Sequence, residues 1–244
     1  EQARLGPAGA PQLVRHRVHQ HRGLAAQHAL DPVGQADAAQ LARSIGQPCL
    51  HHLDAERARQ RAVDWLRRQG HDDKLINRAL FELDKAAALG GSKTLYDANR
   101  EVYGLLRYGV KVKPGAGKQT VTVWLVDWER PENNDFAVAE EVTVYGVHTK
   151  RPDLVLYVNG IALGVLELKR STVAVSEGIR QSLDSQKKEF IRPFYTTVQL
   201  VMAGNDTEGL RYGVIETPEK YWLRWKEAEA PAEGAWFVLR FTRC

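Results

Sequence analysis

The sequence of 244 residues has few cysteines, which cross-link small secreted proteins, and no long apolar run of the kind that anchors proteins in membranes. Its two cysteines, Cys49 and Cys244, do not make a disulfide framework, which favours a reducing cytoplasm. The sequence has no apolar run long enough to cross a bilayer and no apolar centre of a signal peptide near its start, so we expect no membrane association. The chain begins with Glu1 rather than Met, which indicates a fragment or an unusual translation start.

Aromatic residues are missing from residues 1–60, which hold six of the eight histidines. Such a stretch can bury little apolar surface against its ordering entropy, so we expect a poorly structured or anomalous segment, with isolated helix at most around 36–45 and 54–68. An out-of-frame stretch of a GC-rich gene would have the same composition. The run HRVHQHR (residues 16–22) lacks the spacing and the companions of a dedicated metal site.

From residue 61 the sequence has the patterns of a folded domain, and the 43% hydrophobic composition of the whole chain allows a core. Helices are predicted at the segment ending on Gly70, at 72–89 and at 92–108, where Thr94 and Asp97 resemble a capping box. Strands are predicted at 120–128, 140–148, 154–158, 161–169 and 197–203, a helix at 176–190, and a short helix after Pro218. This order predicts an α/β fold with a mixed central sheet flanked by helices, over residues 61–227, followed by a linker or tail at 228–244.

Three charged residues lie in or beside apolar strands: Asp153, Glu167 and Lys169. Glu167 and Lys169 share one face of their strand because side chains alternate with a period of two. Charges on a buried strand are costly unless they are paired or bind a cation. Two carboxylates and a nearby carbonyl, that of Leu168, suit Mg²⁺, and a lysine can then orient the attacking water. This combination indicates phosphodiester hydrolysis; the alternative is a surface pair on an edge strand with Asp153 in a turn.

The hairpin at Asn159-Gly160 sets a condition for this site. A regular two-residue loop would place Asp153 opposite Leu166, on the face away from Glu167. We therefore predict a bulge or an odd-length loop in the hairpin, such as a three-residue loop ending on Gly160, or a sharply bent strand end at Asp153.

The segment RPDLVLYVNGIALGVLELKRS (151–171) resembles the restriction subunit of type I restriction endonucleases. The similarity extends over roughly residues 62–227, through SKTLYDANREVYGLLRYGV, NDFAVAEEVTV, EGIRQSLDSQKKEF and AGNDTEGLRYGVIETPEKYWLRWKE. It implies an N-terminal nuclease domain with a restriction-endonuclease-like PD-(D/E)xK core, in which Asp153, Glu167 and Lys169 match the catalytic motif. It also implies Mg²⁺ as cofactor, double-stranded DNA as substrate, and methyltransferase and specificity subunits as partners.

The resemblance further implies a glutamine on the helix after the hairpin, in a Q-x-x-x-Y element. Gln181 is the best match, although Ser185 replaces the tyrosine; Gln186 followed by Phe190 is the alternative. Glu140 or Glu141 is a candidate for a further acidic group.

The family's ATP-driven translocase is absent from this chain. PGAGKQT (114–120) lacks the first glycine and the Ser or Thr of a phosphate-binding loop and is predicted to be a hairpin turn.

The mild net charge of +4 permits DNA binding, for which the candidate cations flank the catalytic motif: Lys150, Arg151, Arg170, Arg180, Lys187 and Lys188. Two alternatives to a restriction subunit remain at this point. One is a free-standing repair or phage-type nuclease, and the other is an inactive truncated fragment of the restriction subunit.

Overall fold

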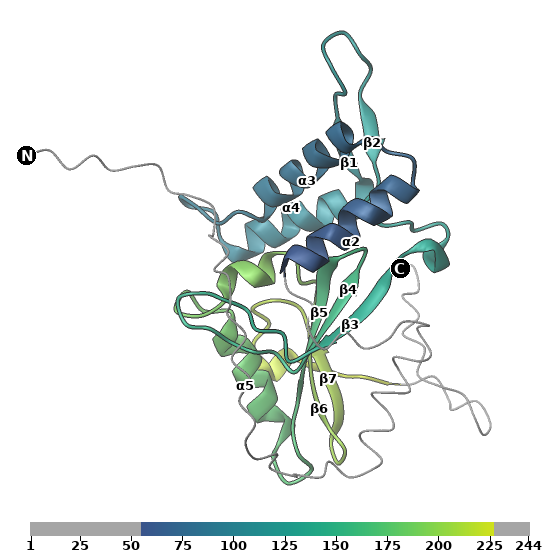
Figure 1. The fold of residues 1–244 in the computed structure, drawn as a ribbon. Coiled ribbons are helices and arrows are strands. Elements are labelled where there is room, and N and C mark those ends of the chain that lie inside the picture. The colour runs from purple at the N-terminus through teal and green to yellow at the C-terminus, as the bar shows by residue number, and fades with distance from the viewer. Residues whose placement is uncertain (1–54, 227–244) are drawn as a thin grey trace, which may run out of the picture.

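The computed structural model describes residues 55–226, which contain a mixed six-stranded sheet and flanking helices (Figure 1). The chain runs through α2 (Ala55–Arg68), α3 (Asp73–Ala87), α4 (Leu95–Tyr108), β1 (Val110–Val112), β2 (Val121–Val123), η1 (Pro131–Asn133), β3 (Phe136–Glu140), β4 (Leu154–Val158), β5 (Ile161–Leu168), α5 (Val175–Ser185), η2 (Arg192–Thr196), β6 (Leu200–Asn205), β7 (Gly209–Gly213), η3 (Glu219–Tyr221) and β8 (Leu223–Arg224). The predicted α/β class with a mixed sheet is confirmed. The histidine run, the helix expected at 36–45 and the tail at 228–244 lie outside the described residues.

The sheet has the order β3-β4-β5-β6-β7-β8 and is antiparallel except between β5 and β6. Parallel neighbours require a crossover, and α5 with η2 provides it. Both elements cover one face of the sheet, where Val165, Val201 and Ala203 pack with Ile179 and Tyr195. This crossover brings α5 directly over the end of β5.

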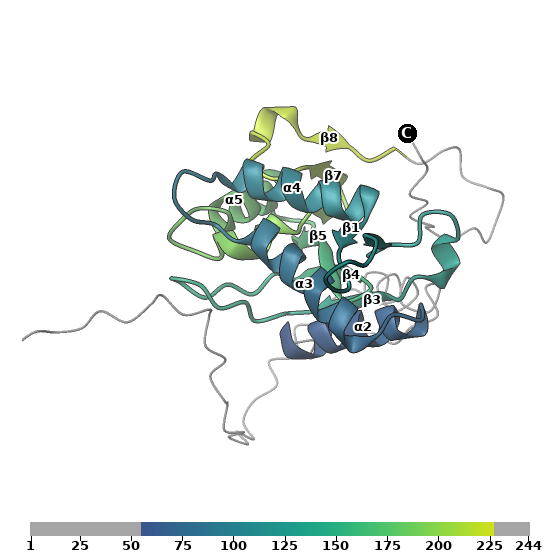
Figure 2. The same cartoon turned by 90° about the horizontal axis from the view of Figure 1, so that it is seen from above.

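The helices α2, α3 and α4 pack at the end of the sheet where the β4–β5 turn lies (Figure 2). Their core joins Trp65 and Leu66 of α2 to Val158 and Ile161 on either side of the turn. The helix α2 is therefore not the isolated helix expected for 54–68, because Trp65 supplies the apolar surface that residues 1–60 lack. The border predicted at residue 61 falls inside this helix.

Local signals explain several element ends. Thr94 and Asp97 form the predicted capping box, with Thr94 Oγ1 accepting from Asp97 N at 3.1 Å. Asp72 caps α3 by accepting from Leu75 N at 2.8 Å. The loop between β1 and β2 is the hairpin connection predicted for residues 114–120.

Four predictions of extent are wrong. The strand expected at 120–128 ends at Val123, because the chain beyond it serves a side-chain network: Leu125 O accepts from Asn159 Nδ2 at 2.9 Å. The strand expected at 140–148 is only a bridge between Val144 and Lys150, because Glu141 adopts a positive φ of 51° that ends β3.

The polar segment 176–190 is helical only to Ser185, and the helix expected after Pro218 is the single turn η3. The strands β3, β7 and β8 were not expected from the sequence.

Candidate active site

The hairpin that carries the candidate acidic residues contains one extra residue. Val158 pairs with Ile161 and Tyr157 with Ala162, but Leu156 pairs with Gly164, so Leu163 has no partner on β4. The positive φ angles of Asn159 (50°) and Gly160 (74°) give a two-residue turn of the type that suits hairpins. The predicted irregularity is present, but it is a bulge within β5 and not a longer loop.

The bulge decides which residues lie opposite each other near the end of the sheet. Beyond it Leu154 pairs with Leu166, so the next pair in the same register is Asp153 and Glu167. Facing residues of neighbouring strands point to the same side, so the two carboxylates converge. A regular hairpin would have placed Asp153 opposite Leu166.

The turn itself is fixed against α2. Asn159 is buried, and its amide nitrogen donates to Leu125 O at 2.9 Å and to Asn134 Oδ1 at 2.8 Å. Asn159 Oδ1 accepts from Asp135 N at 2.7 Å. A Cβ on Gly160 would overlap the Ala58 carbonyl of α2, so a glycine is required there. These contacts hold the hairpin rigidly at the end opposite the carboxylates.

Glu167 is 1% exposed, which is unusual for a carboxylate. Its Oε2 accepts a hydrogen bond from Gln181 Nε2 at 2.6 Å and lies 4.0 Å from the ammonium nitrogen of Lys169. Burial raises the pKa of Glu167 to about 8, and the charge of Asp153 adds to this effect, whereas Lys169 opposes it. A buried carboxyl beside a second carboxylate favours either a proton or a cation.

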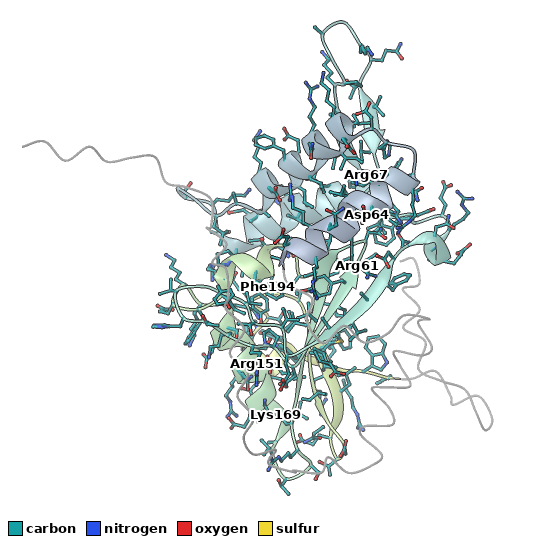
Figure 3. All side chains as sticks on the ribbon, in the orientation of Figure 1. Arg61, Asp64, Arg67, Arg151, Lys169 and Phe194 are labelled. Carbon is teal, nitrogen blue, oxygen red and sulfur yellow. The ribbon has the colours of Figure 1, made fainter. Side chains whose placement is uncertain are left out.

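Gln181 links the acid to the lysine. It donates to Glu167 through Nε2, and its Oε1 accepts from Lys169 Nζ at 2.7 Å. The helix α5 comes close enough because Gly178, one turn earlier, has no side chain: a Cβ there would lie 3.1 Å from Ala203 Cβ and 3.4 Å from Lys169 Cγ. Figure 3 shows Lys169 at the level of α5, away from α2.

Asp153 precedes β4 and is held by the backbone around it. Its Oδ2 accepts from Leu168 N at 2.7 Å, and its carbonyl accepts from Glu141 N at 2.9 Å. Leu168 ends β5 and is 46% exposed. The structure therefore brings together the five residues singled out from the sequence as the candidate site: Asp153, Glu167, Leu168, Lys169 and Gln181.

The alternative candidates lie elsewhere. Gln186 is buried, donates to Ser182 O at 3.1 Å and accepts from Glu216 N at 2.6 Å, which is a structural role. Glu140 pairs with Leu154 in register, so it shares the face of Leu154 and Leu166, opposite to Glu167. Glu141 forms an exposed ion pair with Arg151 at 3.4 Å.

The flanking cations differ in how far their charges are neutralised. Three of them pair with acids: Arg151 with Glu141, Arg180 with Glu177 and Glu219, and Lys187 with Asp184. Lys150 instead lies over the ring of Phe190. Within residues 55–226, Arg170 and Lys188 have no ion pair or hydrogen bond through their side chains.

One feature near the site had no signal in the sequence. Tyr195 in η2 is fully buried, and burial raises the pKa of its phenol well above the ordinary value, with the charge of Glu167 adding to the effect. The hydroxyls of Tyr195 and Ser182 have no hydrogen-bond partner within the described part of the chain. The run RPFYTT has no period that would single out this tyrosine.

Among residues 55–226, no group of three or more His, Cys, Asp and Glu side chains could hold a metal ion. The candidate centre offers two carboxylates and a main-chain carbonyl, a set that suits a cation which keeps several waters. No helix in this part of the chain is both long and apolar enough to cross a bilayer.

Comparison with known proteins supports a single family. The family described as "Type I restriction enzyme R protein N terminus" matches residues 47–220. A curated relative, the "Putative type I restriction enzyme MjaIXP endonuclease subunit" of Methanocaldococcus jannaschii, is 29% identical over 139 residues. That match covers 52% of this chain but only 13% of the relative, so the chain corresponds to a small part of that protein.

Proposed function

Because this chain belongs to the family of type I restriction enzyme R protein N termini, we propose that it is a Mg²⁺-dependent DNA endonuclease domain with a PD-(D/E)xK core. One observation carries the proposal: the bulge at Leu163 brings Asp153 opposite Glu167, and Gln181 hydrogen-bonds both Glu167 and Lys169. Two carboxylates with an ammonium beside them are the groups that metal-assisted phosphodiester hydrolysis needs.

The donor set fits Mg²⁺. The carboxylates of Asp153 and Glu167 and the carbonyl of Leu168 would hold the ion. Glu167 is buried next to a second carboxylate, and the same burial that raises its pKa makes a neutralising partner favourable at this position. When bound, Mg²⁺ supplies a water of lowered pKa and neutralises charge on the phosphate.

The residues of the chain have distinct tasks. Lys169 places its ammonium on the sheet face of Glu167, where it orients the attacking water and stabilises the charge that grows on the phosphate oxygens. Gln181 fixes that ammonium by accepting its hydrogen bond, and it fixes the Glu167 carboxylate by donating to it. Gln181 lies on α5 and Lys169 directly follows β5, so regular elements support both side chains.

The wider role follows from the relative's length. We propose that double-stranded DNA is the substrate and that the intact subunit continues into an ATP-driven translocase, which works with methyltransferase and specificity subunits. Residues 55–226 then supply only the cutting step. The great length of the curated relative favours this role over a free-standing repair or phage-type nuclease.

Plasmid cleavage tests the proposal. The purified chain should nick supercoiled plasmid with Mg²⁺ and not with EDTA, and Lys169→Ala and Asp153→Asn should abolish nicking. Lys85→Ala is the matched control, because Lys85 is exposed on α3 and its one ion pair within residues 55–226 is with Glu82. Equal nicking by wild type and Lys169→Ala would refute this site, and Mg²⁺-independent nicking would refute the cofactor.

A further inference from the structure

Lys150, three residues before Asp153, is held against an aromatic ring. Its ammonium nitrogen lies 4.1 Å from the centroid of the Phe190 ring, and the ring of His148 lies 5.8 Å from that of Phe190. Such a contact attracts the cation without removing its charge. The ammonium is thus positioned while still able to bind an anion.

The backbone around Lys150 is also fixed. Lys150 and Val144 exchange hydrogen bonds, N to O, at 2.9 and 3.1 Å, and His148 N donates to Glu189 O at 3.0 Å. A Cβ on Gly146 would overlap the Phe190 carbonyl, so the two segments touch directly. The loop before Asp153 is therefore attached to the segment after α5.

Lys150 belongs to the segment that leads into the site. It lies three residues before Asp153, and its charge lowers the pKa of Glu167, so it lies within electrostatic range of the buried carboxyl. Within residues 55–226, Lys150 forms no ion pair with a carboxylate, in contrast to Arg151 and Lys187. A cation beside two carboxylates, paired with neither, suits a third anionic group.

We propose that Lys150 is a phosphate-binding residue of the site, which contacts the DNA backbone next to the scissile phosphate, and that Phe190 is its positioning residue. This inference rests on the proposed nuclease function and adds a contact that the catalytic carboxylates and Lys169 do not provide. A DNA strand carries a phosphate at every nucleotide. A second cation near the metal site can therefore contact the phosphate next to the one that is cleaved. The competing role for Lys150 is only to balance the charge of the carboxylates.

The test separates phosphate binding from charge balance. The purified full chain is titrated with a DNA duplex in Ca²⁺, which supports binding without rapid cleavage, over a range of salt concentrations. Lys150→Ala should weaken binding about fivefold to tenfold and lower the slope of log affinity against log salt by about one. Lys150→Arg should restore most of both. Phe190→Leu should weaken binding by a smaller factor because the ammonium stays but loses its platform.

Lys85→Ala is the control, since Lys85 is exposed on α3, is not among the candidate DNA-binding cations and should leave binding unchanged. Urea unfolding checks that each variant is folded. If Lys150→Ala does not fold, Lys150→Gln takes its place. In Mg²⁺, Lys150→Ala should raise KM more than it lowers kcat.

Unchanged affinity and salt slope in folded Lys150→Ala, or loss of kcat alone, would overturn the proposal and leave charge balance as the role. The nuclease function fails on a different result, namely cleavage that survives in Lys169→Ala.

Discussion

Replacing Glu167 with Gln removes the charge at the most buried acid of the site and keeps the volume of the side chain. In the folded chain the pKa of Glu167 is raised to about 8 from its ordinary value of 4.5, mainly by burial. The folded state then holds a proton that the unfolded state has released at neutral pH. Between these two values, stability must fall as pH rises, because the folded state binds more protons.

The size of this effect follows from the interval between the two pKa values. At about 1.4 kcal/mol per pH unit, the metal-free wild type should lose about 3 kcal/mol by pH 7 and about 5 kcal/mol above pH 8, relative to pH 4. Glu167→Gln carries no such group. Its advantage over the wild type should therefore grow from near zero at pH 4 and level off above pH 8.

The assay is urea unfolding in EDTA at a series of pH values, followed by tryptophan fluorescence, which reports on the buried Trp65. Glu132→Gln, at an exposed position, should run parallel to the wild type. Addition of Mg²⁺ should stabilise the wild type and displace one proton below pH 8, but it should not stabilise Glu167→Gln. A stability difference that does not change between pH 5 and 8 would refute the account of Glu167.

The remaining predictions concern the hydrogen-bond link, the turn and a helix cap. Gln181→Ala should lower the single-turnover cleavage rate by roughly tenfold or more with little change in DNA affinity, because Glu167 and Lys169 lose their common partner; a change confined to affinity would contradict this role. Gly160→Ala should destabilise by more than about 2 kcal/mol in urea unfolding, since both φ and the contact with α2 oppose a Cβ, whereas Gly91→Ala, with positive φ but open space, should cost only about 1 kcal/mol; equal losses would show that the contact is unimportant. Thr94→Ala should cost about 1 kcal/mol by the same measurement and Thr94→Ser much less, and a null effect would mean that the capping box does not stabilise α4.

The site was more predictable than the sheet around it. Asp153, Glu167 and Lys169 stood out because charges on apolar strands are rare, and the pairing rules required an irregular hairpin between them. The position of the bulge could not be predicted, because IALGV shows no break in its apolar pattern at Leu163. The resemblance ranked Gln181 above Gln186, but their contacts could not be predicted: Gln181 hydrogen-bonds Glu167 and Lys169, whereas Gln186 donates to Ser182 O.

The sheet edges escaped prediction for local reasons. β7 is the run GLRYG, which has no β-branched residue and two glycines, so its strand character comes from pairing with β6. The segment 140–148 has alternating valines, yet the left-handed backbone at Glu141 ends the strand before they begin. The extent of these strands depends on their pairing partners and on hydrogen bonds to side-chain amides such as that of Asn159. Both come from residues that are distant in the sequence.

The bulge at Leu163 is one residue more than a regular hairpin needs between the turn and the acidic pair. Deleting Leu163 would convert β4 and β5 into a regular ladder and leave Asp153 opposite Glu167, at the cost of one packed side chain and its carbonyl bond to Gln199 N. Without the extra residue, β4 and β5 have the same number of residues between the turn and the acidic pair. A homologous hairpin that is one residue shorter on β5 can therefore carry the same site.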